Sequence, residues 1–381
     1  MKFGIKNLRI DDGLTTITVE GSRIVGLQPL PNSQTEDFFD GKAYWLLPGL
    51  INAHDHLGLD LLPPLGTPPY ANSEDWGKHI YHPESSPLKE IWQLSYSERL
   101  LWGAYRNLLS GVTTVQHHDR GHWRLSRLPV RVPAYRWLHR PGSTLKGQWG
   151  WNAQNAPLFV HCGEGIDPGS YQEVAQLQAA GLLTSQTVLI HAIALKSADI
   201  VLVQKAQSGV VLCPHSNQFL YGKMPSIESL QKAHIPVALG TDSTASGSVD
   251  LMAELRGLRG LLSDSALLAM VTRNAAHLLG VPRLGVLKAS HPADFVLLDR
   301  PEATSQAEAL LTAQPADIRL VVLAGRPMLI RSPFIAQFAQ KLQRVLINDQ
   351  PTWLTGSISS LLKRTEKYLG KRLYFAQEIS I

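Results

Sequence analysis

The sequence predicts an α/β fold whose main domain is a TIM-type (β/α) barrel. Short apolar runs, several of them rich in β-branched residues, recur along the middle of the chain and alternate with segments of helical length. Examples are the runs at 158–160, 187–190 and 237–239. The sequence contains no glycine-rich phosphate turn of the kind that normally follows the first strand of a doubly wound sheet. These observations favour a closed parallel barrel over an open sheet.

Histidine and aspartate residues directly follow several of these apolar runs. His54 and His56 follow one run, and His161, His191 and Asp242 each follow a run of their own. Residues two apart on a strand point the same way, so His54 and His56 can hold one ion together. The carboxyl ends of the strands of a parallel barrel meet at one face, and that face carries the active site. We therefore expect all five side chains to converge there.

These residue types are suited to a catalytic metal. Imidazole and carboxylate groups bind Zn²⁺ or Fe²⁺, and a site of this kind keeps a position open for water. Glu164 lies three residues after His161 in a glycine-flanked turn, from which it can reach that water. Considered alone, His161 is better explained as a core histidine and Asp242 as a helix cap. Their occurrence in one ordered set favours metal binding.

Seven motifs follow one another in order along the chain: PGLINAHDH (48–56), SGVTTV (110–115), HCGE (161–164), CPHSN (213–217), GTDS (240–243), NAAHLLG (274–280) and ADFVLLD (293–299). Together they resemble the amidohydrolase superfamily, and within it the branch of cytosine and guanine deaminases and triazine chlorohydrolases. The resemblance covers most of the chain.

The resemblance implies one divalent metal ion per chain, zinc ahead of iron, held by four ligands: His54, His56, His161 and Asp242. It also implies that His191 lies beside the metal-bound water and that Glu164 is the proton shuttle. No organic cofactor is expected. Glu164, His191 and Asp242 are thus the expected catalytic residues, and Asp242 is expected to act as a metal ligand as well.

The implied function is that of a metal-dependent hydrolase that deaminates a purine, pyrimidine or triazine-like substrate at a C–N bond. Asp242 would accept a proton from the metal-activated water, and Glu164 would protonate the ring nitrogen and then the leaving group. His191 would orient the attacking water or polarise the developing oxyanion. Two alternatives stay open. One is hydrolysis of a cyclic amide, as in imidazolonepropionase-like members, which releases no ammonia; the other is a catalytically silent barrel that binds a ligand or partner.

Three further histidines are candidate substrate contacts. His117 and His118 follow the run at 112–115, and alternation along a strand places them on opposite sides. We expect this pair to support the metal ligands or to contact substrate rather than to bind the metal directly. His215 in the CPHSN motif also follows an apolar run and is the third candidate.

The rest of the chain predicts a small second domain. Residues 1–43 contain short strand-like runs that pair with others in 291–332, which gives a discontinuous β-sandwich made from both chain ends. The barrel then occupies 44–290. One of its units is expected to be irregular, because residues 140–157 are too few for a helix, a strand and a second helix. Residues 333–381 are predicted to form a helical C-terminal extension that packs against the barrel or a second subunit.

Composition limits the classes of partner. The chain has 36 basic and 31 acidic residues, a formal charge of +5, which does not indicate nucleic-acid binding. No apolar run is long enough for a membrane span and no leader pattern is present, so we expect a cytoplasmic protein. The expected partner is a small-molecule substrate, and a homodimer is left open. Cys162 and Cys213 are the only cysteines, so a disulfide framework is not expected.

Overall fold

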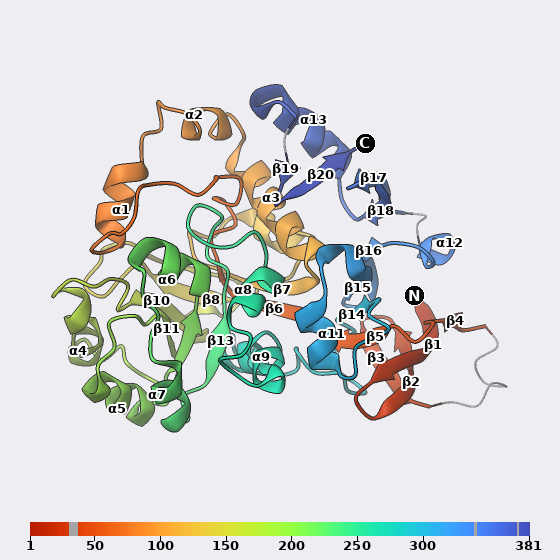
Figure 1. The fold of residues 1–381 in the computed structure, drawn as a ribbon, viewed down its shortest axis with the longest axis horizontal. Helices are drawn as coiled ribbons and strands as arrows, with labels where there is room; N and C mark the ends of the chain where they lie inside the picture. Colours follow the sequence, from red (N-terminus) through yellow and green to blue (C-terminus); the bar gives the residue numbers. More distant parts are fainter. Residues whose placement is uncertain (30–36, 339–340, 372) are drawn as a thin grey trace.

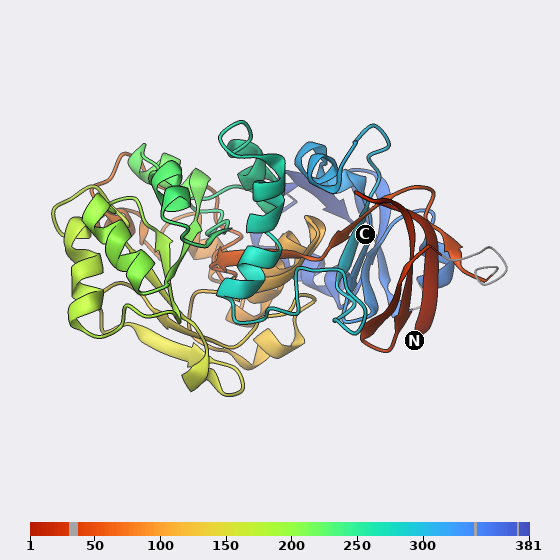
Figure 2. The ribbon, with the colours of Figure 1, turned by 90° about the horizontal axis from the view of Figure 1, so that it is seen from below.

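Two sheets organise the molecule: a barrel of parallel strands and an extended sheet built from both chain ends (Figures 1 and 2). The computed structural model describes residues 1–29, 37–338, 341–371 and 373–381. The two bodies lie side by side, with the barrel and its helices on the left of Figure 1 and the extended sheet on the right. This arrangement confirms the predicted combination of a barrel and a second sheet built from both chain ends.

The barrel wall, within the described residues, consists of seven strands: β6 (Leu50–Asp55), β7 (Val112–His117), β8 (Tyr135–Leu138), β10 (Leu158–Cys162), β11 (Thr187–His191), β12 (Gly209–Leu212) and β13 (Val237–Leu239). Strands β6 and β7 pair in parallel, as do β8, β10, β11, β12 and β13 in that order. A parallel bridge between Thr114 and Arg131 joins β7 to the segment before β8. The Thr241 amide donates to the His54 carbonyl and so joins the end of β13 to β6.

The irregular unit predicted between β8 and β10 is confirmed. In place of a further βα unit the chain makes a hairpin, in which β9 (Lys146–Trp149) pairs antiparallel with β8. Strand β8 then pairs directly with β10, from Leu158 opposite Arg136 to Val160 opposite Leu138. The hairpin fits into residues 140–157, where a full unit of helix and strand does not.

Helices surround the barrel and lie above its strand ends: α1 (Ser73–Ile80), α2 (Leu88–Ile91), α3 (Tyr96–Leu109), α4 (Glu173–Ala179), α5 (Ser197–Lys205), α6 (Pro214–Tyr221), α7 (Ile227–Lys232), α8 (Leu251–Gly257), α9 (Asp264–Met270) and α10 (Arg273–Leu278). Short 3₁₀ turns lie at η2 (Trp123–Arg127), η3 (Ala153–Asn155) and η4 (Ser170–Gln172). Local sequence explains several boundaries. A capping box between Ser95 and Glu98 starts α3, and Gly222 in the left-handed region ends α6.

Strand alternation divides the barrel core into two sets of apolar side chains. Phe159, Ile190 and Val211 belong to a cluster that fills the barrel and includes apolar residues of α10. Their neighbours along the strands, such as Val160 and Leu189, pack outward into the larger cluster that includes the surrounding helices. Because both faces of each strand are apolar and buried, the strands are nearly continuous hydrophobic runs.

The second sheet contains β1 (Lys2–Ile10), β2 (Gly13–Glu20), β3 (Arg23–Gln28), β4 (Phe39–Asp40), β5 (Trp45–Pro48), β14 (Phe295–Leu298), β15 (Ile318–Leu323), β16 (Arg326–Ile330), β17 (Gln343–Ile347), β18 (Gln350–Leu354), β19 (Leu373–Tyr374) and β20 (Gln377–Ser380). The two ends of the chain meet where β5 pairs with β1 on one side and β14 on the other. Helix α11 (Gln306–Thr312) and the turn η5 (Pro315–Asp317) connect β14 to β15. Leu30, the end of one predicted strand, lies outside the described residues. The domain boundaries at 43, 290 and 332 stay a prediction.

The predicted helical tail is partly wrong. Helices α12 (Ile335–Phe338) and α13 (Ile358–Leu369) are present, but β17 and β18 form a hairpin between them. We predicted a helical extension over 333–381, of which Ala339, Gln340 and Arg372 lie outside the described residues. The helical spacing of apolar residues is overridden by sheet pairing: β18 pairs with β16, and β17 pairs with β18. Val345 and Ile347 of β17 are buried. The hairpin thus extends the sheet beyond β16.

The tail packs on the barrel helix α3. The Trp102 indole Nε1 donates to Thr365 Oγ1 at 2.7 Å, and the Trp102 ring stacks on Tyr374 with centroids 4.4 Å apart. Arg364 forms an ion pair with Glu98 at the rim of this contact. The expectation that the tail packs against the barrel is therefore confirmed, whereas a homodimer stays a prediction. Among the described residues, none of the helices has the length and apolarity that crossing a bilayer requires.

Replacing Trp102 should destabilise the whole fold. We expect Trp102→Ala to lower the free energy of unfolding by about 3–5 kcal/mol, because it empties a buried site and removes the stack on Tyr374. Urea unfolding followed by circular dichroism measures this. Trp151, which is 95% exposed, provides the control, and Trp151→Ala should change the value by less than about 0.5 kcal/mol. Equal effects of the two changes would refute a structural role for the tail contact.

Candidate metal centre

Four potential metal ligands converge at the carboxyl ends of the barrel strands. The rings of His54 and His161 lie next to each other, with their Nε2 atoms 3.4 Å apart. The Oδ1 atom of Asp242 lies 3.9 Å from His54 Nε2 and 3.7 Å from His56 Nε2. Ligand atoms of His54, His56 and His161 all lie within 4.8 Å of one another. The structure therefore brings together the four residues that the sequence indicated as ligands.

The spacing and charge state of these atoms fit a divalent ion. Zinc bonds of about 2.0–2.1 Å in a tetrahedral site place neighbouring ligand atoms roughly 3.3 Å apart, close to the separation of the His54 and His161 nitrogens. Burial, reinforced by the neighbouring histidines, holds the pKa of both rings well below its usual value. The rings are thus neutral, which is the form that binds metal. An ion between them would also remove the repulsion between their lone pairs.

Asp242 supplies the carboxylate of the cluster. It lies in the turn after β13 with a φ of 54°, and its Oδ2 atom accepts hydrogen bonds from Ser216 Oγ and Ser246 Oγ. Burial works to raise its pKa, but His56 and His54 outweigh this and hold the pKa of Asp242 well below its usual range. It caps no helix, because the next helix, α8, begins at Leu251. Asp242 is therefore a charged carboxylate with a fixed orientation, as a metal ligand requires.

Glu164 and His191 lie beside the four potential ligands. Glu164 Oε2 is 3.5 Å from His161 Nδ1, and Glu164 Oε1 is 3.6 Å from His191 Nε2. The Tyr221 hydroxyl donates to Glu164 Oε1 at 3.0 Å. His191 Nδ1 lies 2.8 Å from the side-chain oxygen of Asn217, so that ring nitrogen carries a proton and Nε2 faces Glu164. A carboxyl group and an imidazole nitrogen thus face the same small space.

The CPHSN motif explains much of this order. Pro214 opens α6, and the next turn of the helix directs Ser216 to Asp242 and Asn217 to His191. Second-layer contacts of this kind fix the tautomer and rotamer of groups at a metal site. Tyr221, at the last position of α6, was missed in the sequence because no motif marks it.

Arg106 was also missed, although it joins the two loops that carry the ligands. This arginine of α3 is 1% exposed, and its Nη1 atom donates to Asp60 Oδ1 at 2.6 Å, Asp55 Oδ2 at 3.3 Å and the Asp242 carbonyl at 3.1 Å. Its Nη2 atom donates to the Ser248 carbonyl at 2.6 Å. Burial raises the pKa of both carboxyl groups, and the Arg106 charge opposes this shift. Nothing in the helical pattern of α3 distinguishes Arg106 from a surface arginine.

His117, the last residue of β7, and His118 directly after it point to opposite sides, as alternation predicts. The His118 ring stacks on His161 with centroids 4.3 Å apart, and neither of its ring nitrogens has a hydrogen-bond partner among the described residues. His117 points the other way, with Nε2 3.2 Å from the Tyr96 hydroxyl. His118 is therefore the member of the pair that faces the metal cluster.

His215 does not join the cluster. Its Nδ1 atom lies 3.1 Å from Glu254 Oε2, and its side chain is 45% exposed on the outer side of α6. The reason is geometric: the strand run ends at Leu212, and α6 turns each successive side chain by about 100°. His215 therefore faces away from the side on which Ser216 and Asn217 reach the ligands.

His139 is a further histidine near the site. It follows β8, and its ring centroid lies 5.4 Å from that of His161. Burial lowers its pKa. Its position directly after a strand-like run is the same signal that identified the other histidines, so the sequence could have indicated it.

The fold is a (β/α) barrel, and the donors clustered at its strand ends are suited to a divalent metal ion. Residues 161–328, less than half of the chain, match the amidohydrolase family. The family resemblance seen in the sequence motifs is thereby confirmed.

Two relatives are similar to this chain over most of its length. A 5-methylthioadenosine/S-adenosylhomocysteine deaminase from Carboxydothermus hydrogenoformans is 24% identical, covering 81% of this chain and 87% of that protein. The enzyme of the same name from Halalkalibacterium halodurans is 23% identical, covering 87% and 90% respectively. The chain thus spans nearly the full length of these relatives.

Solved structures confirm the fold. The zinc complex of the atrazine chlorohydrolase TrzN from Arthrobacter aurescens superposes with a TM-score of 0.74 at 19% identity, covering 96% of this chain and 99% of that one. An adenosine deaminase from Xanthomonas campestris with bound zinc gives a TM-score of 0.69 at 17% identity, covering 96% and 97%.

Removing the Arg106 charge should destabilise the protein strongly. We expect Arg106→Met to lower the free energy of unfolding by about 3–5 kcal/mol, because it leaves buried Asp55 and Asp60 without their cation. The control is Arg99→Met on the same helix, which removes hydrogen bonds to two carbonyl groups and the contact of the guanidinium with the Trp92 ring but leaves no carboxylate without a partner, and it should cost about 1–2 kcal/mol. Urea unfolding compares the two variants. Equal losses would contradict the role assigned to Arg106.

Loss of one support of Asp242 should weaken metal binding without unfolding the protein. We expect Ser216→Ala to lower zinc affinity by about 10-fold or more, because it removes a hydrogen bond that orients the carboxylate. Competition with a chromophoric chelator measures the affinity. Ser208, equally buried but bonded to the Thr184 carbonyl, provides the control, and Ser208→Ala should leave zinc affinity unchanged. A similar affinity in both variants would show that Ser216 has no such role.

Proposed function

We propose that the protein is a deaminase that uses one divalent metal ion, zinc in the first instance, to remove an amino group from a heterocyclic ring. The observation that carries this proposal is the convergence of His54, His56, His161 and Asp242 with Glu164 and His191 at one face of the barrel. Relatives that cover most of the chain are named as deaminases of adenine nucleosides, and we infer that an adenine nucleoside is the substrate class.

Metal, water and protein groups would divide the chemistry between them. When bound, the divalent ion lowers the pKa of water toward neutrality and so supplies a nucleophile for an electrophilic ring carbon. Asp242 is suited to accept the proton released, because two serine hydroxyls fix one carboxylate oxygen and leave the other toward His54 and His56.

Glu164 is suited to carry protons to the substrate. One carboxyl group reaches both His161 and His191, and the Tyr221 hydroxyl holds its Oε1 atom in place. From this position Glu164 would protonate the ring nitrogen as the carbon is attacked, and then the departing amine. Tyr221 would act as a positioning residue, because it touches Glu164 rather than the reacting atoms.

His191 would orient the attacking water and stabilise the oxygen charge that develops. Asn217 accepts from its Nδ1 atom and so fixes the tautomer, which leaves Nε2 directed at the space beside Glu164. A ring fixed in this way does not need to reorganise during the reaction, which is the condition for effective electrostatic stabilisation.

We assign His118 to substrate binding. The ring is 2% exposed, faces the cluster and has both nitrogens free of hydrogen-bond partners among the described residues, which is costly unless a ligand satisfies them. A purine edge presents donor and acceptor nitrogens for such a partner. His139 and Trp137, both close to His118 or His161, would border the same space. His117 is placed behind it, against Tyr96.

The decisive experiment combines metal analysis with ammonia release from 5-methylthioadenosine. We expect about one zinc per chain in the wild type and in Glu164→Gln, and little metal in Asp242→Ala. Both variants should lose activity, Glu164→Gln by about 10²–10⁴-fold, while folding normally by circular dichroism. Glu302→Gln, at an exposed carboxylate, provides the control for Glu164 and should keep full activity.

Three outcomes would count against the proposal. Full activity in Glu164→Gln would overturn the proton shuttle, and an absence of metal even after reconstitution would favour the silent scaffold. Hydrolysis of a cyclic amide without ammonia release would favour the imidazolonepropionase-like alternative.

A further inference from the structure

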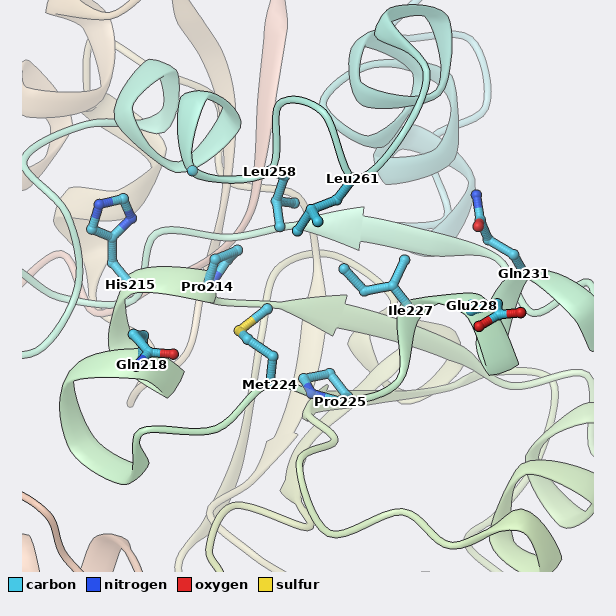
Figure 3. A pocket seen from close by; sticks show the side chains of 11 residues that line it. Pro214, His215, Gln218, Met224, Pro225, Ile227, Glu228, Gln231, Leu258 and Leu261 are labelled. Atoms are coloured by element: carbon cyan, nitrogen blue, oxygen red, sulfur yellow. The ribbon is translucent and has the colours of Figure 1, made fainter.

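A cavity separate from the metal centre lies on the outer side of the barrel, between α6, α7 and the end of α8 (Figure 3). Its volume is about 740 Å³, which is within the range of small-molecule sites. The wall is mainly apolar, and its principal contributors are Pro214, Met224, Ile227, Leu258 and Leu261. Figure 3 shows these side chains facing one another across the opening. None of the four metal ligands lines it.

One ionisable ring lies at the edge of this apolar space. His215 lines the cavity, and its Nδ1 atom is held 3.1 Å from Glu254 Oε2. Glu254 is fully buried and also accepts from the backbone amides of His215 and Ser248, so it cannot turn away. This hydrogen bond raises the pKa of His215. Because Nδ1 is held by Glu254, Nε2 is the ring nitrogen that remains for a ligand.

The carboxylate that lines the cavity forms an ion pair on the solvent-exposed side of α7. Glu228 Oε1 lies 2.5 Å from the Nζ atom of Lys232, one turn further along the helix. The remaining polar lining groups are the side-chain amides of Gln218 and Gln231. The cavity therefore combines an apolar wall with two amides, an exposed ion pair at its edge and the His215 ring, and this ring is the group that a carboxylate on an apolar molecule would meet.

The two helices that form the wall also hold the metal centre. In α6 the residues directly after His215 are Ser216 and Asn217, which bond to Asp242 and His191. In α8, Glu254 accepts from the Ser248 amide, and the Ser248 carbonyl in turn accepts from Arg106. A molecule that changes the separation of α6 and α8 would therefore act on the supports of the metal ligands.

We propose that this cavity is a regulatory site for a small amphipathic molecule that has an apolar body and one carboxylate, and that its binding alters the metal centre through α6. The carboxylate would accept from His215, and the body would fill the space between Met224, Ile227 and Leu258. Such a ligand changes the metal site because it favours one spacing of α6 and α8 over others. The regulatory part rests on the metal centre used by the proposed function, whereas the binding part does not.

The first test measures binding of naphthoate to the full-length, zinc-loaded protein, with naphthol as the uncharged probe. We expect saturable binding of naphthoate at one site per chain by titration calorimetry. Ile227→Trp and Leu261→Trp, which fill the cavity from two sides, should each weaken it by about 10-fold or more. His215→Gln should weaken naphthoate by about as much and leave naphthol unchanged. Val201→Trp, on an exposed face of α5 outside the cavity, is the matched control and should bind as the wild type does.

The second test measures coupling through the rate at which a chelator removes zinc. Saturating naphthoate should change this rate by about fivefold or more in the wild type and not in Ile227→Trp. No saturable binding, or binding undiminished in both tryptophan variants, overturns the site. Binding with no change in zinc release overturns the regulatory role. Neither measurement uses the deaminase reaction, so a protein that binds naphthoate and deaminates nothing would refute the proposed function alone.

Discussion

The buried guanidinium of Arg106 is the interaction on which the site depends. It joins the end of β6 and the loop after it, through Asp55 and Asp60, to the turn after β13, through the Asp242 carbonyl. These two segments, which meet where the barrel closes, carry three of the four potential metal ligands: His54, His56 and Asp242. A buried ion-paired network of this kind contributes little to net stability, because desolvation offsets attraction. Its contribution is geometric, because it holds the two segments in one arrangement.

The missing βα unit shows which parts of the barrel this geometry needs. The hairpin of β8 and β9 takes the place of the further parallel strand and helix that a regular barrel would have. The potential ligands still converge. They come from β6, β10 and the turn after β13, and Glu164 and His191 from the ends of β10 and β11. All these strands keep their parallel pairing, either with β7 or with one another. The irregular unit therefore lies between β7 and β10, in an arc of the wall that carries none of the four potential ligands.

Sequence patterns predicted the strand-end residues well and the residues that support them poorly. His161 and His191 could be found because an apolar run followed by a polar residue places that residue at a barrel mouth. Arg106 could not, because a helix pattern does not show which partner an arginine reaches across the fold. His215 was misplaced because β12 ends at Leu212 and α6 begins at Pro214, so His215 lies in the helix and not at the strand end. The β17 strand was missed because its burial depends on pairing with β18 and β20, which the local spacing of its apolar residues does not show.

Helix α6 shows how one short segment can serve two sites. Successive side chains on a helix point about 100° apart, so His215 faces outward where Ser216 and Asn217 face the metal centre. The helix has eight residues, from Pro214 at its first position to Tyr221 before the C-cap Gly222, so the outward side chain and the two inward ones lie on a single short segment. A displacement of this segment would act on both Asp242 and His191. The same segment that orients the ligands is what would make the centre sensitive to a molecule bound outside it.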